Sequence, residues 1–367
     1  MSVSYQFYST TQSAWEAMLK AVSAAKRSVY WEVYAFHDDA VGRCFIEALK
    51  ERASTGVDVR LVVDGLGSYG LSNAAEAELK IAGIELLRYH RLGPGWNPRT
   101  WLRRVWFRNH RKVLVVDHAT AFIGGVNIWE PARDWDDLHL QINGSGVAVL
   151  LEGFIKNYLR SGGSKHRLKS LRQALRSGRT ANYWQRAVRF IMTSPFSGRN
   201  ALAWRRLYRR SLAQARTRVQ FVSPYYTPDL QFIAQIRAAC RRGVEVHILL
   251  PLQSDHSFMS RMAEHFWRRT VAVGAKLFLL PGMNHSKALT VDGHTALVGS
   301  MNITARSFLH NEESAVVLSD PAMIKDLNAI LENWKQRAVP FTEAHRRSGQ
   351  WFRRLISWAL SHLRGWV

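Results

Sequence analysis

The chain has 367 residues and a formal net charge of +23 at neutral pH, and this length is sufficient for two lobes of ordinary size with substantial cores. Its two cysteines exclude a disulfide framework. No stretch reaches the roughly 20 uncharged apolar residues that a membrane-spanning helix needs, so any membrane contact is expected to be peripheral.

The elements predicted for the first half of the chain recur in the second half. In the first half the pattern predicts a helix, a strand, a helix and a strand at residues 13–27, 28–36, 41–55 and 57–63. In the second half the same order is predicted at residues 203–215, 219–222, 230–242 and 244–250. The recurrence indicates duplication of a whole α/β lobe, and each lobe is expected to be a mixed sheet flanked by helices.

Each half also contains one copy of a spaced motif. The first copy, NHRKVLVVDHATAFIGGVN, contains five motif residues, and the second, NHSKALTVDGHTALVGSMN, repeats their types and spacing. The five residues of the first copy are His110, Lys112, Asp117, Gly124 and Asn127. Those of the second copy are His285, Lys287, Asp292, Gly299 and Asn302.

The local pattern assigns a place to each motif residue. Short apolar runs follow each lysine and end at Asp117 and Asp292, so each run is predicted to be a buried strand entering a hairpin turn. Residues two apart in a strand point to the same side, so the His and Lys of each copy share a face. Asp117 and Asp292 have the opposite parity and are interpreted first as turn residues. The glycines are expected to let the backbone approach whatever the His and Lys side chains face.

Two imidazoles, two ammonium groups and two amides converging on one point would form a site for a phosphate diester. Lys112, Lys287, Asn127 and Asn302 are predicted to hold the non-bridging oxygens. One histidine can attack phosphorus while the other protonates the leaving oxygen. This chemistry requires no metal and no cofactor.

At these residues the chain resembles the phospholipase D superfamily, whose signature is this HKD motif. Within it the chain looks most like bacterial cardiolipin synthases of the shorter, peripheral type, on softer signals at residues 36–42, 63–68, 223–229, 251–256 and 299–313. The resemblance implies two lobes related by a pseudo-two-fold axis, with one active site at their interface. It places His110, Lys112, Asp117, His285, Lys287 and Asp292 among the catalytic residues.

An acid downstream of each motif is expected to orient the catalytic ring, because a carboxylate on the second ring nitrogen fixes the tautomer. From the family pattern this role is assigned to Asp137 and Glu313. Asp136 and Glu312 are adjacent alternatives that parity cannot separate across a loop.

Composition predicts four regions: a first lobe at 1–150, a basic linker at 151–185 with a flexible joint at 161–164, a second lobe at 186–340, and a basic C-terminal helix at 341–367. Between Gly153 and Pro228 there are 17 Lys or Arg and no Asp or Glu. Such a surface favours a polyanion, either an anionic lipid sheet or a nucleic acid.

Two segments are candidates for membrane contact. The first lobe has about a dozen extra residues before its motif, with Trp96, Trp101 and Trp106 among basic residues. They form either a solvated loop with some core aromatics or a loop that inserts Trp into lipid headgroups. Residues 351–367 predict an amphipathic helix that lies on a membrane or docks on the core.

The resemblance then predicts a phosphatidyltransferase that converts two phosphatidylglycerol molecules into cardiolipin and glycerol, with His110 as nucleophile and His285 as acid and base. The alternatives are a phospholipase D hydrolase, transfer to another alcohol, and, less favoured, a basic endonuclease. The expected partner is an anionic phospholipid membrane containing phosphatidylglycerol and cardiolipin, at the cytoplasmic face of the bacterial plasma membrane. No nucleic acid is expected, and the oligomeric state stays open.

Overall fold

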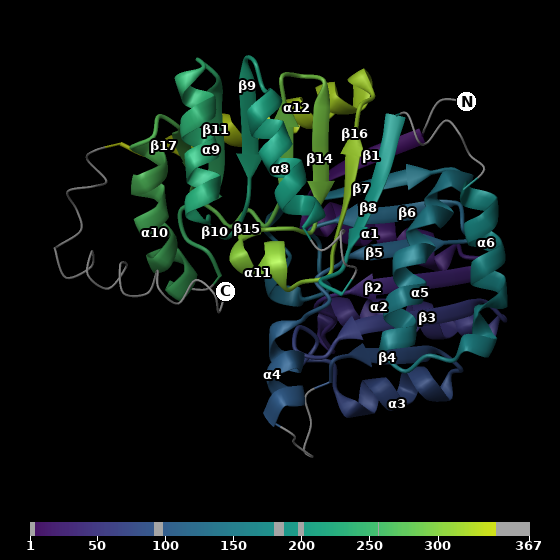
Figure 1. The fold of residues 1–367 in the computed structure, drawn as a ribbon. Helices are drawn as coiled ribbons and strands as arrows, with labels where there is room; N and C mark the ends of the chain where they lie inside the picture. The colour runs from purple at the N-terminus through teal and green to yellow at the C-terminus, as the bar shows by residue number, and fades with distance from the viewer. Residues whose placement is uncertain (1–3, 92–97, 180–186, 197–201, 256, 343–367) are drawn as a thin grey trace.

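The computed structural model describes residues 4–91, 98–179, 187–196, 202–255 and 257–342, which form two α/β lobes (Figure 1). The first lobe contains a seven-stranded mixed sheet. Its strands, in spatial order, are β1 (Ser4–Thr10), β7 (Asp136–Asn143), β6 (Thr120–Gly124), β5 (Val113–Val116), β2 (Ser28–Val33), β3 (Asp58–Asp64) and β4 (Glu85–Tyr89). One face is covered by α1 (Thr11–Ser23), α2 (Ala40–Ser54) and α3 (Asn73–Ile81).

The second lobe contains an eight-stranded sheet. Its strands, in spatial order, are β17 (Val339–Pro340), β12 (Lys276–Leu280), β11 (Glu245–Pro251), β9 (Arg218–Val222), β13 (Ala288–Val291), β14 (Thr295–Gly299), β16 (Glu313–Leu318) and β8 (Val188–Thr193). Helices α8 (Ala203–Gln214), α9 (Leu230–Arg241) and α10 (Ser257–Val271) cover one face, and α12 (Pro321–Arg337) packs on the other. The small elements β10 (Tyr226–Thr227), β15 (Ile303–Thr304) and α11 (Ala305–Leu309) lie beside the site.

The two sheets have the same strand order once β17 is set aside, which confirms the predicted fold class and the duplicated lobe. The match extends to local signals. Helices α2 and α9 begin at Asp39 and Asp229, whose carboxylates accept hydrogen bonds from backbone amides three residues on. Both helices are followed by a glycine with φ of 86°, Gly56 and Gly243, a conformation that residues with a β-carbon rarely adopt.

The lobes share a hydrophobic core. Buried residues of the first sheet, such as Ile123 and Leu140, belong to the same cluster as Val298 and Val316 of the second sheet. Strands β6 and β7 therefore lie against β14 and β16. This packing brings the ends of β6 and β14, which belong to the two motifs, to the interface between the lobes. One site at this interface can therefore contain residues of both lobes.

The segment predicted as a linker is mostly helical. Helices α5 (Leu151–Arg160) and α6 (Lys169–Arg179) cover the second face of the first sheet, with η2 (Ser145–Leu150) before them and η3 (Lys165–Leu168) between them. Phe154, Tyr158 and Leu171 are buried in the shared core. Described basic side chains of these helices, such as Lys156, Lys169 and Arg172, are exposed. Residues 161–164 form a turn in which the amide of Gly163 donates to the carbonyl of Tyr158.

The remaining predicted segments are described only in part. The C-terminal helix predicted at 351–367 and Trp96 lie outside the described residues. The insertion in the first lobe forms helix α4 (Pro98–Trp106). Within the part of the chain that the structure describes, no helix combines the length and apolar character needed to cross a bilayer.

Candidate active site

Both histidines are anchored by the backbone of the opposite lobe. The amide of His110 donates to the carbonyl of Glu312 at 2.9 Å, and the amide of His285 donates to the carbonyl of Asp136 at 2.7 Å. Parallel bridges pair Asn109 with Glu312 and Asp136 with Asn284. The backbone at the start of each motif therefore pairs, over a single bridge, with the backbone of the other lobe.

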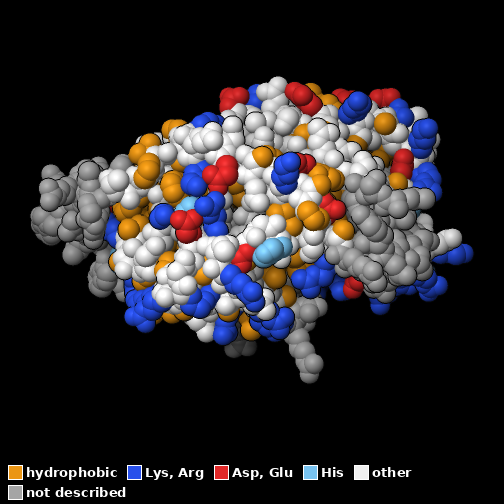
Figure 2. Space-filling model, turned by 90° about the horizontal axis from the view of Figure 1, so that it is seen from above, with side chains coloured by type: hydrophobic (Ala, Val, Ile, Leu, Met, Phe, Trp, Pro, Cys, Tyr) orange, Lys and Arg blue, Asp and Glu red, His pale blue; other side chains and the backbone are white. Residues whose placement is uncertain are grey.

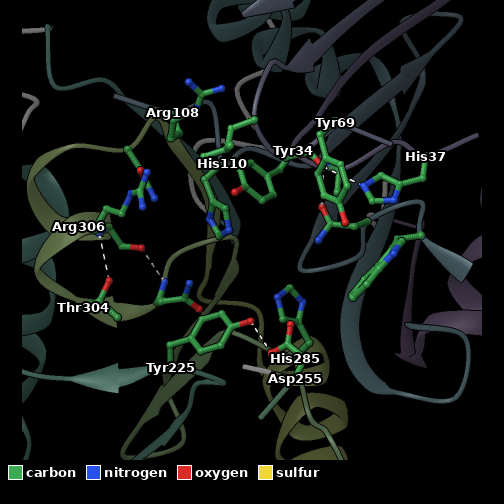
Figure 3. Close-up of a pocket in the computed structure, with 18 of the residues that line it drawn as sticks. Tyr34, His37, Tyr69, Arg108, His110, Tyr225, Asp255, His285, Thr304 and Arg306 are labelled. Atoms are coloured by element: carbon green, nitrogen blue, oxygen red, sulfur yellow. Dashed lines mark hydrogen bonds between the residues drawn. The ribbon is translucent and has the colours of Figure 1, made fainter. Parts of the chain in front are cut away.

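The two imidazoles line one pocket with a volume of about 390 Å³. His110 and His285 point toward one another across it (Figure 3), and they are only 7% and 5% exposed. Asn127 and Asn302 line the same pocket. The structure thus brings together both predicted histidines and both predicted amides.

The two lysines lie behind the histidines. Lys112 and Lys287 are fully buried and are not among the described residues that line the pocket. The Nζ atom of Lys112 donates to the carbonyl of His110 at 2.8 Å and lies 5.0 Å from the ring centroid of Tyr34. The Nζ atom of Lys287 lies 2.9 Å from each ring nitrogen of His285. Both amino groups thus lie at the floor of the site, against the two histidines.

Asp137 and Glu313, the two acids expected to orient the rings, each contact a histidine, and their pairing is crossed. His110 Nδ1 lies 3.1 Å from Glu313 Oε2, and His285 Nδ1 lies 2.9 Å from Asp137 Oδ2. Each acid thus contacts the histidine of the other lobe rather than the one that precedes it in its own lobe. With Nδ1 held in this way, Nε2 is the ring nitrogen available for chemistry.

The two pairs differ electrostatically. Burial raises the pKa of Glu313 to about 7, even though Lys112 and hydrogen bonds from Ser300 and Asn311 oppose the change. Burial would also raise the pKa of Asp137, but attraction to His285 outweighs it and the pKa stays below its ordinary value. Asp137 is therefore ionised at neutral pH, whereas Glu313 gains and loses its proton near pH 7.

Burial and neighbouring charges also shift the pKa values of the basic groups. The pKa of His110 is held well below its ordinary range by burial and by Lys112, Lys287 and His285. Burial and Lys287 lower the pKa of His285 as well, although Asp137 opposes the change. Burial lowers the pKa of Lys287 to about 8 and that of Lys112 well below its usual value. His110 is consequently neutral at neutral pH, and the negative charge of a bound phosphodiester would raise the pKa of His285 toward its protonated form.

Asp117 and Asp292, named as catalytic by the family signature, occupy the hairpin turns. The Asp117 carboxylate accepts hydrogen bonds from the amides of residues 26–28, and the Asp292 carboxylate accepts them from the amides of residues 216–218. Both have positive φ, as a tight hairpin turn requires. They fasten the hairpin that carries each lysine to the start of the neighbouring strand, and no contact joins them to a catalytic histidine.

The motif glycines lie where strands pass close to one another. A β-carbon at Gly124 would lie 2.2 Å from the carbonyl oxygen of Leu138, and one at Gly299 would lie 2.4 Å from that of Ser314. Both glycines are needed where β6 and β14 pass close to β7 and β16. A side chain at either position would push the neighbouring strands of the sheet apart.

Sequence reasoning missed a buried ionic network beside His110. Arg111 donates to Glu312 at 2.6 Å, and Glu312 also accepts from Arg160 and Ser194. Arg108 pairs with buried Asp64 and lines the pocket. The arginines had been interpreted only as part of a basic segment, and Glu312 only as the alternative to Glu313. Adjacent positions of a strand point to opposite sides, which is why these two glutamates have different partners.

Among the described residues, no group of three or more His, Cys, Asp and Glu side chains is arranged to hold a metal ion. The pocket offers two imidazoles and two amides, with two lysines behind the rings. Such a set can attack phosphorus, protonate a leaving alcohol and neutralise the charge of the phosphate oxygens.

Comparison with known proteins agrees with this chemistry. The family model described as "Cardiolipin synthase, PLD-like domain" matches residues 18–157 and 208–335. The chain belongs to this cardiolipin synthase family. Cardiolipin synthase A of Pseudomonas aeruginosa is 31% identical over 345 residues, which cover 92% of this chain and 68% of that protein. Cardiolipin synthase of Clostridium perfringens is 27% identical over 328 residues, covering 87% and 68%.

A solved structure of similar fold is the phosphatidylserine synthase of Haemophilus influenzae, with a TM-score of 0.75 at 14% identity, covering 99% of this chain and 95% of that one. At that identity the likeness establishes the fold. The two ranges that the family model matches contain one histidine–lysine pair each, His110 with Lys112 and His285 with Lys287. The protein is accordingly an enzyme of the phosphatidyltransferase class.

Proposed function

We propose that the protein is a cardiolipin synthase that transfers a phosphatidyl group between two phosphatidylglycerol molecules, giving cardiolipin and glycerol. The observation that carries the proposal is the single pocket lined by His110 and His285, each with Nδ1 against a buried acid from the opposite lobe. Two such imidazoles facing one phosphodiester supply a nucleophile and a proton donor. The relatives described as cardiolipin synthases support cardiolipin as the product.

In the first step, Nε2 of His110 attacks the phosphorus of phosphatidylglycerol. The bond between phosphorus and the headgroup glycerol oxygen breaks, its electron pair stays on that oxygen, and His285 donates a proton to it. Glycerol leaves and a phosphatidyl-histidine remains. The leaving alkoxide would be too basic to depart without this proton, so the acid is essential in this step.

In the second step, the neutral His285 removes a proton from a free headgroup hydroxyl of a second phosphatidylglycerol. That oxygen attacks phosphorus, and the bond between phosphorus and Nε2 of His110 breaks. The electron pair returns to the ring, so His110 is restored and cardiolipin is released. The two half-reactions predict ping-pong kinetics.

The unequal acids support this division of roles. Asp137 is ionised at neutral pH, so its negative charge stabilises the imidazolium form of His285. A proton donor must adopt this form. The pKa of His110 lies well below its ordinary range, which favours the neutral ring that a nucleophile needs. An ionised Glu313 would then accept the Nδ1 proton of His110 and strengthen its attack.

The amides and lysines suit the non-bridging phosphate oxygens. The Oδ1 atom of Asn127 accepts from the amide of Ala35 at 3.2 Å, which leaves its Nδ2 group to donate into the pocket. Lys112 and Lys287 lie directly behind the rings and would be drawn to the phosphate charge. Binding a dianionic transition state would also raise the pKa values of both lysines and keep them protonated.

The partner that we propose is an anionic membrane, reached from the cytoplasmic side. Figure 2 shows Lys and Arg side chains along the lower edge of the view with few Asp or Glu among them. Helix α4 adds Trp101 and Leu102, which are 37% and 46% exposed, beside Arg103 and Arg104. Each basic residue near an anionic surface contributes on the order of 1 kcal/mol, and exposed Trp favours the headgroup layer.

Incubating the purified enzyme with phosphatidylglycerol vesicles, and measuring the products by mass spectrometry, tests the function. Cardiolipin and glycerol in equal amounts are expected, with His110→Ala and His285→Ala inactive. Phosphatidic acid as the sole product would instead indicate a hydrolase, and plasmid nicking without lipid turnover would indicate a nuclease. In His285→Ala, a phosphatidyl adduct on His110 is expected, and an adduct on neither histidine would refute the covalent scheme.

A further inference from the structure

A second cavity lies in the second lobe, beside helix α8 (Figure 1), and has a volume of about 600 Å³. Its walls are α8 on one side and the strands β8, β13, β14 and β16 on the other. Strand β13 runs from Ala288, next to Lys287, to Val291, which lines this cavity. Since a strand rises about 3.3 Å per residue, Val291 lies roughly 13 Å along the chain from the catalytic lysine. No described residue lines both this cavity, here called the α8 cleft, and the pocket of the histidines.

The rim of the α8 cleft is cationic. It contains Arg189 of β8, Arg210 of α8 and Arg216, which follows α8, and all three are exposed. Within the part of the chain that the structure describes, the guanidinium groups of these three residues form no ion pair or hydrogen bond. By contrast, Arg205 on the same helix pairs with Asp229 at 2.8 Å. The rim therefore presents guanidinium donors that a ligand can engage.

The one acid among the described residues that line the cleft is already engaged. Asp292 Oδ1 accepts from the amides of Thr217 and Arg218 at 2.8 Å, and Oδ2 accepts from the amide of Arg216 at 2.8 Å. Although burial opposes the change, these hydrogen bonds lower the pKa of Asp292 to about 2, so the residue is ionised at neutral pH. One committed carboxylate thus faces three arginines, and the cleft attracts anions.

The sequence explains why these arginines have no acidic partner. They belong to the run from Gly153 to Pro228, which contains 17 Lys or Arg and no Asp or Glu. No acid of their own segment can neutralise them, and the neighbouring hairpin supplies only Asp292. The polyanion that this run was predicted to favour therefore has a defined place to bind.

The floor of the cleft is apolar. It contains Leu207 of α8 with Val291 and Val317, which are 8% and 7% exposed. A free phosphate or a nucleic acid backbone would engage the rim and leave this floor facing water. A phospholipid can use both parts, because its phosphate meets the rim while its glycerol and first chain carbons cover the floor. The volume of the cleft is also in the usual range of small-molecule sites.

We infer that the α8 cleft binds the phosphodiester of an anionic phospholipid as a second, non-catalytic site. Arg189, Arg210 and Arg216 donate to the phosphate oxygens, and the acylated glycerol lies on Val291 and Val317. Charge-assisted hydrogen bonds of this kind are short and strong. A lipid bound there holds the enzyme on an anionic membrane while the catalytic pocket is free to exchange its substrates.

Sedimentation with vesicles of phosphatidylglycerol and phosphatidylcholine in equal parts tests the site. Every protein carries His110→Ala, so that no lipid is consumed. The double variant Arg210→Gln and Arg216→Gln should bind about a hundredfold more weakly, since each lost hydrogen bond to a charged group is worth about tenfold or more. The single variant Arg189→Gln should bind about tenfold more weakly.

The matched control is the double variant Arg209→Gln and Arg241→Gln. It removes the same charge from exposed positions of α8 and α9 that do not line the cleft. It should lose severalfold in binding at most, because charges out of contact with the phosphate act through screened solvent. Equal losses in the two double variants would show a diffuse attraction to the membrane and would overturn the site.

Hydrogen exchange locates the ligand without any change to the cleft. Soluble dihexanoyl phosphatidylglycerol should slow the exchange of backbone amides at residues 207–216 and 291–295, and inorganic phosphate at the same concentration should not. Equal protection by inorganic phosphate would overturn the assignment to a lipid. Protection by a short single-stranded DNA and not by the lipid would indicate a nucleic acid site instead. No protection at these residues would overturn the site itself.

This inference and the proposed function fail separately, because lipid binding is measured here without turnover. A protein that makes no cardiolipin can still bind lipid in the α8 cleft. An enzyme whose cleft binds no lipid can still convert phosphatidylglycerol in the pocket of the histidines.

Discussion

Replacing Asp137 with asparagine tests the crossed pairing of acids and histidines. The substitution keeps the shape of the side chain and an oxygen that can accept from Nδ1 of His285, but it removes the negative charge. If Asp137 stabilises the imidazolium of His285, the variant loses the proton donor of the first step. The nucleophile should be spared, because His110 is paired with Glu313.

The size of the effect follows from the geometry. The charge centres of the imidazolium and the carboxylate are about 4 Å apart, and both side chains are buried, so little screening by solvent is expected. At an effective dielectric constant of about 20, their attraction is about 4 kcal/mol. Since each 1.36 kcal/mol corresponds to a factor of about ten, transfer from phosphatidylglycerol should slow about a thousandfold.

The assay compares two leaving groups in a single turnover. Glycerol must be protonated as it leaves, whereas a nitrophenolate leaves without a proton. Asp137→Asn should therefore release glycerol about a thousandfold more slowly, but release nitrophenolate from the corresponding phosphatidyl ester within about tenfold of the wild-type rate. Glu313→Gln, which weakens the nucleophile, should slow both.

Asp136→Asn is the matched control, because the side chain of Asp136 pairs with Arg337 at the surface and not with a catalytic ring. It should behave as wild type with both substrates. If Asp137→Asn slowed the nitrophenyl ester as much as phosphatidylglycerol, Asp137 would not act through a proton donor, and the reasoning would be refuted.

Three further predictions concern pH, stability and membrane binding. The kcat/KM should rise with pH as Glu313 ionises near pH 7, and it should fall again as Lys287 loses its proton near pH 8. If Glu313→Gln showed the same rise of kcat/KM at low pH as the wild type, the role of Glu313 would be contradicted. Asp292→Ala should lower the free energy of unfolding by about 2 kcal/mol in urea titrations. Hydrogen bonds depress the pKa of Asp292 to about 2 in the folded protein. The stability that Asp292 contributes is therefore present above its pKa in the unfolded chain, near 4, and is lost as the pH falls toward 2. A destabilisation by Asp292→Ala that persisted at pH 2 would exclude a charge-based role. The double variant Trp101→Ser and Leu102→Ser should sediment severalfold less with anionic vesicles. Its rate of glycerol release from detergent-dispersed substrate should be unchanged. Unaltered sedimentation would show that α4 is a solvated helix without a role in membrane binding.

The pairing of residues within one strand could be predicted from the sequence, because it depends only on local periodicity. His110 and Lys112 share a side for the same reason that His285 and Lys287 do. The turn role of Asp117 and Asp292 was predictable too, since an acid that ends an apolar run is a common turn signal. The family pattern, rather than the local one, had placed these two residues in the chemistry.

The crossing of the acids could not be predicted in this way. Asp137 and Glu313 follow the histidines of their own lobes by 27 and 28 positions, so spacing suggests pairing within a lobe. What decides the pairing is the backbone bridge between Asn109 and Glu312, which is a contact across more than half of the chain. Such a contact leaves no trace in the periodicity of either segment.

The burial of Arg108 and Arg111 could not be predicted from the sequence for a related reason. Arg108 and Arg111 lie in a stretch whose composition is that of a solvated basic loop, yet both are almost wholly buried. Their burial is tolerated only because Asp64 and Glu312 arrive from distant segments to compensate the charge. Composition measures charge, but tertiary packing decides which charges meet solvent.

The crossed arrangement makes the active site a property of the interface rather than of either lobe. If the lobes separated, His110 would lose both Glu313 and the backbone partner of its amide, and His285 would lose Asp137 and its own backbone partner. Each ring would then be free to rotate and to change tautomer, so neither could serve as nucleophile or as acid. The buried ion pair of Arg111 with Glu312 crosses the same interface and resists separation, because parting the two would leave an uncompensated charge. Docking of the lobes and assembly of the histidine pair are therefore one event, and we expect neither lobe alone to form the proposed phosphatidyl-histidine.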